Sequence, residues 1–180
     1  MITVSDVQNY TLTEIESQFQ PQIEAWIEAI TIHIEKVTQR KFEVDTQPEE
    51  KLFDGNDKNI LLVDDFTEIT TIEIGDKDIT SEVIAYPANT IPKYKLFYKE
   101  RFIAGNQNIK INAKWGTEAT ADVKLACTIL VSGIVQNQNK LAGDIVQEKI
   151  GDYQVSYTQE QYADFKRAME ILASYRNYTI

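Results

Sequence analysis

The chain has 180 residues, of which 43% are hydrophobic and 26% charged, the composition of a folded globular protein. Its formal net charge of −10 argues against a general binder of nucleic acids or membrane surfaces. A single cysteine excludes an internal disulfide and a cysteine-based zinc framework, so we expect a reducing compartment.

No secretory or membrane segment is expected. Residues 1–10 are polar and lack both a basic start and an apolar stretch. The longest apolar run, near residues 126–135, is shorter than the ~20 residues that span a bilayer. We therefore expect a cytosolic protein with no membrane partner.

The charge is unevenly distributed along the chain. Residues 1–92 carry 6 Lys/Arg and 19 Asp/Glu, whereas residues 93–114 carry 6 Lys/Arg and one glutamate. Because complementary potentials steer association, the acidic part of one subunit could dock against the basic segment of a neighbour. The alternative is that these lysines simply lie on the exposed surface of strands.

The N-terminal part predicts helices. Apolar residues recur at steps of three and four between Pro21 and Lys41, the pattern of a helix with one buried stripe. Residues 3–19 predict a shorter helix, with Ser5 and Thr13 as candidate N-caps. The stripe of the long helix consists of Ile23, Trp26, Ile27, Ile30, Ile34 and Val37.

After Phe42, short apolar runs separated by Gly, Pro and Asn predict strands joined by turns. In the last run the apolar residues alternate from Ile109 to Trp115, so we expect one buried face, with Lys110 and Lys114 toward water. A turn at residues 104–107 predicts that the last two strands form an antiparallel hairpin. The expected strands are 60–63, 68–74, 94–98 and 108–115.

The helical pattern returns at residues 119–138, where Cys127 should be buried, and at residues 159–175. Between them, alternating apolar residues around Gly151 predict a short extended or hairpin segment. We predict an α+β fold: a helical core of two long helices plus N- and C-terminal helices, with an inserted antiparallel β module. One domain, 1–180, is expected, helical over 1–42, with the β insert over 43–116, and helical over 117–180 with the extended segment at about 147–157.

Residues able to carry chemistry are few. His33 is the only histidine and lies at the edge of an apolar stripe, so we expect a boundary residue. Asp64 and Asp65 are neighbours on a strand and should point to opposite faces, where they cannot share a proton or a metal ion. The turn at residues 54–57 resembles part of a calcium loop but lacks its closing glutamate. We predict no catalytic residue, no cofactor and no metal ion.

The last 30 residues are rich in tyrosine, which is favoured where a surface is apolar yet needs a polar group. We predict a protein interface here; the alternative is the ordinary edge of a core. The predicted interface residues are Ile150, Tyr153, Val155, Tyr157, Tyr175, Arg176, Tyr178 and Ile180.

Three stretches together resemble the head–tail connector family of tailed bacteriophages, also called adaptor or head-completion proteins. Residues 34–42 are similar to the end of the family's first long helix, with its Thr-x-Arg-x-Phe pattern. Trp115-Gly116 and residues 121–126 are similar to the turn that leads into the second long helix, although Thr120 or Ala121 stands where many relatives carry proline. Residues 148–157 resemble the family's IGD-x-x-VSY segment.

The resemblance implies a structural subunit and not an enzyme. It implies a ring, of twelve copies in the virion, that binds beneath the portal protein, extends the DNA channel and provides the docking site for a stopper or tail-completion protein. DNA would pass without specific binding, which suits an acidic subunit. The implied location is the host cytoplasm during assembly and then the virion neck, and a monomer in isolation is compatible with this role. Two alternatives stay open, another structural protein of the phage neck or tail and a small metal-dependent hydrolase.

Overall fold

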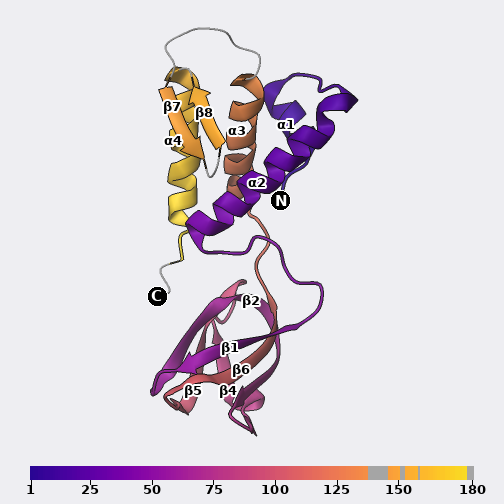
Figure 1. The fold of residues 1–180 in the computed structure, drawn as a ribbon. Coiled ribbons are helices and arrows are strands. Elements are labelled where there is room, and N and C mark those ends of the chain that lie inside the picture. The colour runs from indigo at the N-terminus through magenta and orange to yellow at the C-terminus, as the bar shows by residue number, and fades with distance from the viewer. Residues whose placement is uncertain (138–145, 151–152, 158, 178–180) are drawn as a thin grey trace. The chain divides into compact units, whose positions relative to one another are not determined.

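The computed structural model describes residues 1–137, 146–150, 153–157 and 159–177 (Figure 1). The chain forms two compact units. The helical unit comprises Met1–Gln39 and Ala119–Asn177, and the sheet unit comprises Arg40–Glu118. The sheet unit is therefore continuous in sequence, whereas the helical unit is assembled from both ends of the chain.

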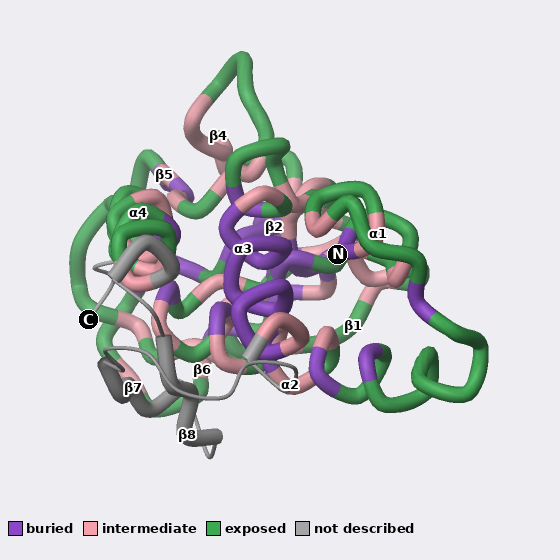
Figure 2. The backbone as a smooth tube through the Cα atoms, turned by 90° about the horizontal axis from the view of Figure 1, so that it is seen from above, coloured by how far each residue is buried: buried purple, intermediate pink, exposed green. Residues whose placement is uncertain are grey.

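The helical unit is built around α3. Its helices are α1 (Val4–Thr11), the short 3-10 helix η1 (Ser17–Phe19), α2 (Gln20–Thr38), α3 (Ala121–Asn137) and α4 (Gln159–Ser174). Helix α3 contacts α1, α2 and α4, and Figure 2 shows it buried along most of its length. Strands β7 (Val146–Ile150) and β8 (Tyr153–Tyr157) form an antiparallel hairpin, as predicted, and β8 lies against α3 and α4.

The ends of the first two helices follow local rules, with one correction. Helix α1 begins with a capping box, in which the Thr3 amide donates to Asp6 Oδ2 at 2.7 Å and the Asp6 amide donates to Thr3 Oγ1 at 3.3 Å. The prediction of Ser5 and Thr13 as caps is wrong. In α2 the predicted stripe is buried at Ile23, Trp26, Ile30 and Ile34 and half-buried at its two remaining positions.

The sheet unit contains a six-stranded antiparallel sheet. Its strands are β1 (Glu49–Gly55), β2 (Lys58–Ile74), β3 (Lys77–Asp78), β4 (Val83–Tyr86), β5 (Lys93–Phe102) and β6 (Gly105–Trp115), with the short 3-10 helix η2 (Thr80–Glu82) before β4. The order is β1-β6-β2-β5-β4, and β3 pairs with β2. The long strand β2 pairs with β5 over its first half and with β6 over its second half.

The sheet encloses its own hydrophobic core. The predicted alternation in β6 is confirmed: Ile109, Ile111, Ala113 and Trp115 are buried, while Lys110 and Lys114 lie on the other face and pair with glutamates of β2. The core consists of Leu61, Val63, Phe66, Ile72, Ile79, Leu96, Tyr98, Phe102, Ile109, Ile111, Ala113 and Trp115.

The predicted fold class is wrong in its architecture. A six-stranded sheet with its own core replaces the small inserted module that a helical core was expected to carry. The largest fully buried side chains, Trp115, Tyr98, Phe66 and Phe102, all belong to this sheet unit. Bulky residues of this kind contribute the most apolar burial, so the strands close on each other without needing helices to cover them.

The predicted hairpin of residues 94–98 with 108–115 is also wrong, because β2 lies between β5 and β6. A turn signal tells where the chain reverses but not which strands then pair. In the part of the chain that the structure describes, no helix is both long enough and apolar enough to cross a bilayer.

Candidate protein interface

The predicted interface residues that the structure describes lie in the β7–β8 hairpin and directly after α4, in the helical unit. Ile150 ends β7 and pairs with Tyr153 at the start of β8. Val155 and Tyr157 follow at alternate positions of β8, opposite Glu148 and Val146. Tyr175 and Arg176 directly follow α4, and Tyr178 and Ile180 lie outside the described residues.

Tyr175 joins the end of α4 to the start of α3. Its hydroxyl donates to the Asp122 carboxylate, with distances of 2.8 and 2.7 Å to the two oxygens. Thr120 Oγ1 donates to Asp122 Oδ1 at 2.6 Å and lies 2.9 Å from the Tyr175 hydroxyl. Hydrogen bonds from Thr120 and Tyr175 favour the charged carboxylate and lower the pKa of Asp122 below its ordinary value.

The next two residues bind the C-terminal end of α2. Arg176 Nε donates to the Val37 carbonyl at 3.2 Å, and the Asn177 amide donates to the Thr38 carbonyl at 2.7 Å. Carbonyls in the last turn of a helix have no partner within the helix, and a cation is favourable there. Residues 175–177 therefore hold the ends of three helices together.

Two other motif residues support the sheet unit at the points where the chain enters and leaves it. Arg40 Nη1 donates to both oxygens of Asp65, at 2.9 and 2.7 Å, and Asp65 is 4% exposed. Gly116 has φ +94°, and a Cβ at this position would lie 2.0 Å from the Glu43 carbonyl oxygen. The Thr117 amide donates to the Lys41 carbonyl at 2.9 Å, which ties the two passages together.

The Arg40–Asp65 pair was not predicted from the sequence. Burial outweighs the attraction of Arg40 and raises the pKa of Asp65 above its ordinary value. The signal in the sequence is that Asp65 closely follows an apolar run and could be buried. A buried carboxylate needs a cation as its partner. The segments by which the chain enters and leaves the sheet unit therefore depend on the Arg40–Asp65 pair and on Gly116.

The carboxylates considered for catalysis are used in the fold. Asp64 is exposed and bonds Lys51 Nζ at 2.6 Å, while Asp65 is buried against Arg40, so the prediction of opposite faces is confirmed. In the turn at residues 54–57, Asp54 Oδ1 accepts from the Gln107 amide at 2.6 Å. Among the residues with described positions, no group of three or more His, Cys, Asp or Glu is arranged to hold a metal ion.

The two side chains with nucleophile or base chemistry have unreactive surroundings. His33 is half-buried, as predicted for a boundary residue, and burial together with Lys36 lowers its pKa. Cys127 is buried in α3, and desolvation raises the pKa of its thiol to about 12. A thiol with that pKa is protonated at neutral pH and is a poor nucleophile.

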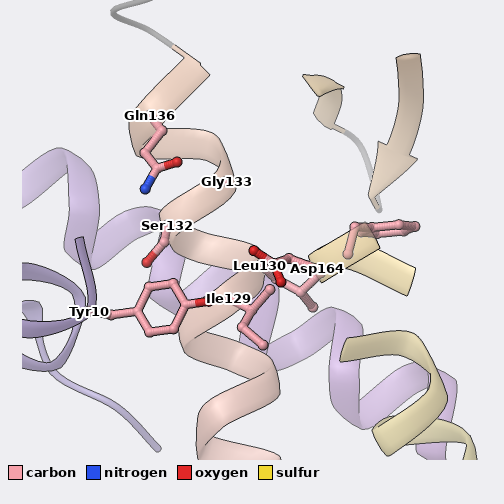
Figure 3. Close-up of a pocket in the computed structure, with 8 residues that line it drawn as sticks. Tyr10, Ile129, Leu130, Ser132, Gly133, Gln136 and Asp164 are labelled. Carbon is pink, nitrogen blue, oxygen red and sulfur yellow. The ribbon is translucent and has the colours of Figure 1, made fainter. Parts of the chain in front are cut away.

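The helical unit contains a small cavity and a larger groove. The cavity lies beside Tyr10 and is lined by Ile129, Ser132 and Asp164 (Figure 3). Its volume of about 30 Å³ gives room for one or two water molecules. The groove has a volume of about 270 Å³, and both apolar residues, such as Ile15 and Trp26, and the glutamates Glu14 and Glu16 line it. His33 and Cys127 line neither the cavity nor the groove.

Arg40 and Gly116, which belong to two of the stretches of family resemblance, thus connect parts of the fold where the chain enters and leaves the sheet unit. A family model described as "head completion protein" matches residues 1–178. This chain belongs to the head completion protein family. No curated protein matches it significantly.

Membership covers almost the whole chain, so both units belong to the head completion protein. It is a bacteriophage structural protein that takes part in virion assembly. Its place is the neck of the virion, where it interacts with other head and tail components.

Proposed function

We propose that this head completion protein is a connector subunit: it forms a ring of twelve copies beneath the portal, extends the DNA channel and provides the docking site for the stopper or tail. The observation that carries the proposal is the family match over residues 1–178, which includes all three stretches of resemblance. In this role residues 1–180 act as one connector domain that assembles in the host cytoplasm, and no catalysis is involved.

The charge supports the proposed passage of DNA. Each phosphate that a protein neutralises adds counterion-release affinity and would slow a moving duplex. A chain with a net charge of −10 avoids this. We expect no binding of duplex DNA by the isolated protein at 50 mM salt in fluorescence anisotropy. Strong binding that weakens steeply with salt would contradict an acidic channel wall.

The proposed portal contact is the C-terminal tail, Tyr178–Ile180, together with the β7–β8 hairpin, which precedes α4 in the sequence. Hydrogen bonds fix the preceding residues, Tyr175 to Asn177, within the helical unit. An interface segment that starts from a fixed point loses less freedom on binding than a free tail does. A chain that ends at Asn177 keeps the three residues that make these hydrogen bonds.

The test is a portal pull-down with a chain that ends at Asn177. A second chain, which ends at Leu172, also loses the contacts of residues 175–177. We expect the first to keep the melting temperature of the full chain and to lose portal binding, and the second to be less stable as well. Replacing residues 178–180 by three serines controls for length.

Full portal binding by the chain that ends at Asn177 would show that the tail is not the contact. Cryo-electron microscopy of the full chain mixed with its portal tests the proposed role as a whole. A ring on the portal is expected. Binding to a tail component without binding to the portal would instead support the alternative of another neck or tail-completion protein.

A further inference from the structure

The outward side of three strands in the sheet unit carries an apolar patch. Strands β2, β5 and β4 pair so that Ile60, Phe97 and Ile84 lie directly opposite one another in one row. Two residues further along, the next row lies on the same side. The two rows together are named the apolar sheet face: Ile60, Phe97, Ile84, Leu62, Lys95 and Tyr86.

The side chains of this face are not needed for the core. The residues between the two rows, Leu61 and Leu96, are 4% and 0% exposed and point to the opposite side. By contrast, Ile60 is 41% exposed, Leu62 46% and Ile84 52%. Contiguous exposed apolar residues on a sheet mark a surface that another molecule covers, since a solvated face normally carries polar residues.

The charge on the apolar sheet face selects its partner. Lys95 Nζ lies 5.3 Å from the ring centre of Tyr86, and Lys99 follows two positions after Phe97. Neither lysine forms an ion pair with any described residue, whereas Lys110 and Lys114 on β6 both do. Two copies of the face would bring their lysines together, so the face does not fit itself.

An acidic and partly apolar surface fits better, and the chain offers one. Helix α2 exposes Glu24, Glu28 and Ile32 at intervals of four residues, with Ile32 54% exposed. Neither glutamate forms an ion pair with any residue whose side chain is described. We call these three residues the acidic stripe. It lies on one side of the helix, because positions i, i+4 and i+8 are neighbours there.

We propose that the apolar sheet face of one subunit binds the acidic stripe of α2 in a second subunit. The lysines then meet glutamates, while Ile84 and its neighbours meet Ile32. Such a contact joins two different surfaces, which is the type of interface that closes into a ring. The inference rests on the proposed function, because it names the surfaces through which neighbours in the ring meet.

The contact is expected to be weak in the free protein. The two surfaces contain far fewer than the about 20–30 residues a side of a stable interface. A portal that holds neighbouring subunits side by side raises their effective concentration and would strengthen the contact. The experiment therefore includes the portal.

The test is photo-crosslinking from the apolar sheet face. We would replace Ile84 by p-benzoylphenylalanine and irradiate a mixture of isotopically light and heavy chains bound to the portal. We expect crosslinked dimers of one light and one heavy chain whose linked peptide includes residues 20–38. Ile103 is a matched control, because it is 63% exposed in the same unit but lies outside the face. Unchanged melting temperatures of both variants would confirm folding.

Charge reversal sharpens the result. Lys95→Glu in one chain should lower the dimer yield about five- to tenfold, since exposed pairs are worth little individually but reversal replaces attraction by repulsion. Glu28→Lys in the partner chain should restore most of it. Equal yields at positions 84 and 103, links only within one chain, links only to the portal, or no effect of Lys95→Glu would overturn the proposal.

Portal binding by the unmodified chain separates this inference from the proposed function. Retained portal binding without crosslinked dimers from position 84 would reject the apolar sheet face alone. If the unmodified chain does not bind the portal, the proposed function itself is rejected.

Discussion

The sheet unit and the helical unit are held together by different means. The sheet unit is one continuous stretch whose core is made by residues of its own strands, with ion pairs such as Lys114–Glu68 at 2.8 Å across the sheet. The helical unit joins the first part of the chain to the last, and residues 175–177 hydrogen-bond the ends of α2 and α3. We infer that the sheet unit can hold its fold without the helices, whereas the helical unit needs residues 175–177 to join its ends.

The largest expected effect breaks the sheet unit alone. Trp115 is 1% exposed, packs edge-on to Phe66, and donates from Nε1 to the Glu49 carbonyl at 2.7 Å. Trp115→Ala should lower the free energy of unfolding of the sheet unit by about 3–5 kcal/mol. Hydrogen exchange measured by mass spectrometry should show faster exchange in the strands β1 to β6 and unchanged exchange in α2 and α3.

Trp26→Ala is the matched variant in the helical unit, where Trp26 is 8% exposed. It should give faster hydrogen exchange in α2 and α3 and unchanged exchange in the strands β1 to β6. If either variant destabilises both units equally, the chain unfolds as one cooperative block and the comparison fails.

The second effect concerns the passage of the chain into the sheet unit. Arg40→Met leaves the buried Asp65 carboxylate without a cation and should cost about 2–4 kcal/mol, below the cost of a fully buried pair because the Arg40 side chain is 20% exposed. Urea unfolding at pH 7 measures the loss. Asp65→Asn in the same chain should recover part of it, because the amide is neutral.

The cost of Arg40→Met should also depend on pH. The pKa of Asp65 is raised by burial even with Arg40 present, and losing the cation raises it further. A raised carboxyl pKa means that stability is greatest at low pH and is lost as the pH rises above the ordinary aspartate value of ~3.9 and through the raised one. The difference between variant and parent should therefore be smaller at pH 4 than at pH 7, and equal differences would show that Asp65 is not a buried charge.

A smaller effect tests the turn that leaves the sheet unit. Gly116→Ala places a methyl group 2.0 Å from the Glu43 carbonyl oxygen at φ +94° and should cost about 2–3 kcal/mol. Gly75→Ala is the control, because Gly75 also has positive φ, +58°, but no atom lies within 4 Å of the added Cβ. Gly75→Ala should lower the free energy of unfolding by about 1 kcal/mol, measured by thermal unfolding. Equal losses would remove the close approach at Gly116 as a cause.

The smallest effect tests closure of the helical unit. Tyr175→Phe removes the hydroxyl that donates to Asp122 and should cost no more than about 1 kcal/mol. The pKa of Asp122, lowered by Thr120 and Tyr175, should rise toward its ordinary value when measured by NMR. A carboxyl group with a lowered pKa stabilises the fold at pH values above its ordinary pKa, and this stability is lost as the pH falls through the lowered pKa. Tyr175→Phe should therefore lose less stability in acid than the unmodified chain does.

Tyr94→Phe in the sheet unit, where Tyr94 is 38% exposed, is the control and should leave Asp122 unchanged. If Asp122 titrates with an ordinary pKa in the unmodified chain, Tyr175 does not hydrogen-bond it and does not join α4 to the start of α3.

The predicted interface shows what residue composition can and cannot predict. The abundance of tyrosine near the C-terminus directed attention to Tyr175 and Arg176, which proved to bond residues more than 50 positions away in the same chain. Composition indicates an amphipathic surface but does not say which chain covers it. The role of these eight residues in binding another protein therefore stays a prediction.

Elements that depend on local geometry could be predicted from the order of residues alone. The spacing of Ile23, Ile30 and Ile34 predicted the buried side of α2, and the alternation from Ile109 to Trp115 predicted the buried side of β6, because side-chain direction repeats with a period set by the backbone. The folded structure was needed to show that β2 lies between β5 and β6 and that the strands form a unit with its own core. It was also needed to show that Ile60, Phe97 and Ile84 lie in one row on the outside of that unit. Strand pairing joins residues far apart in the chain, and its free energy comes from the core that the strands build together, which no short stretch of sequence contains.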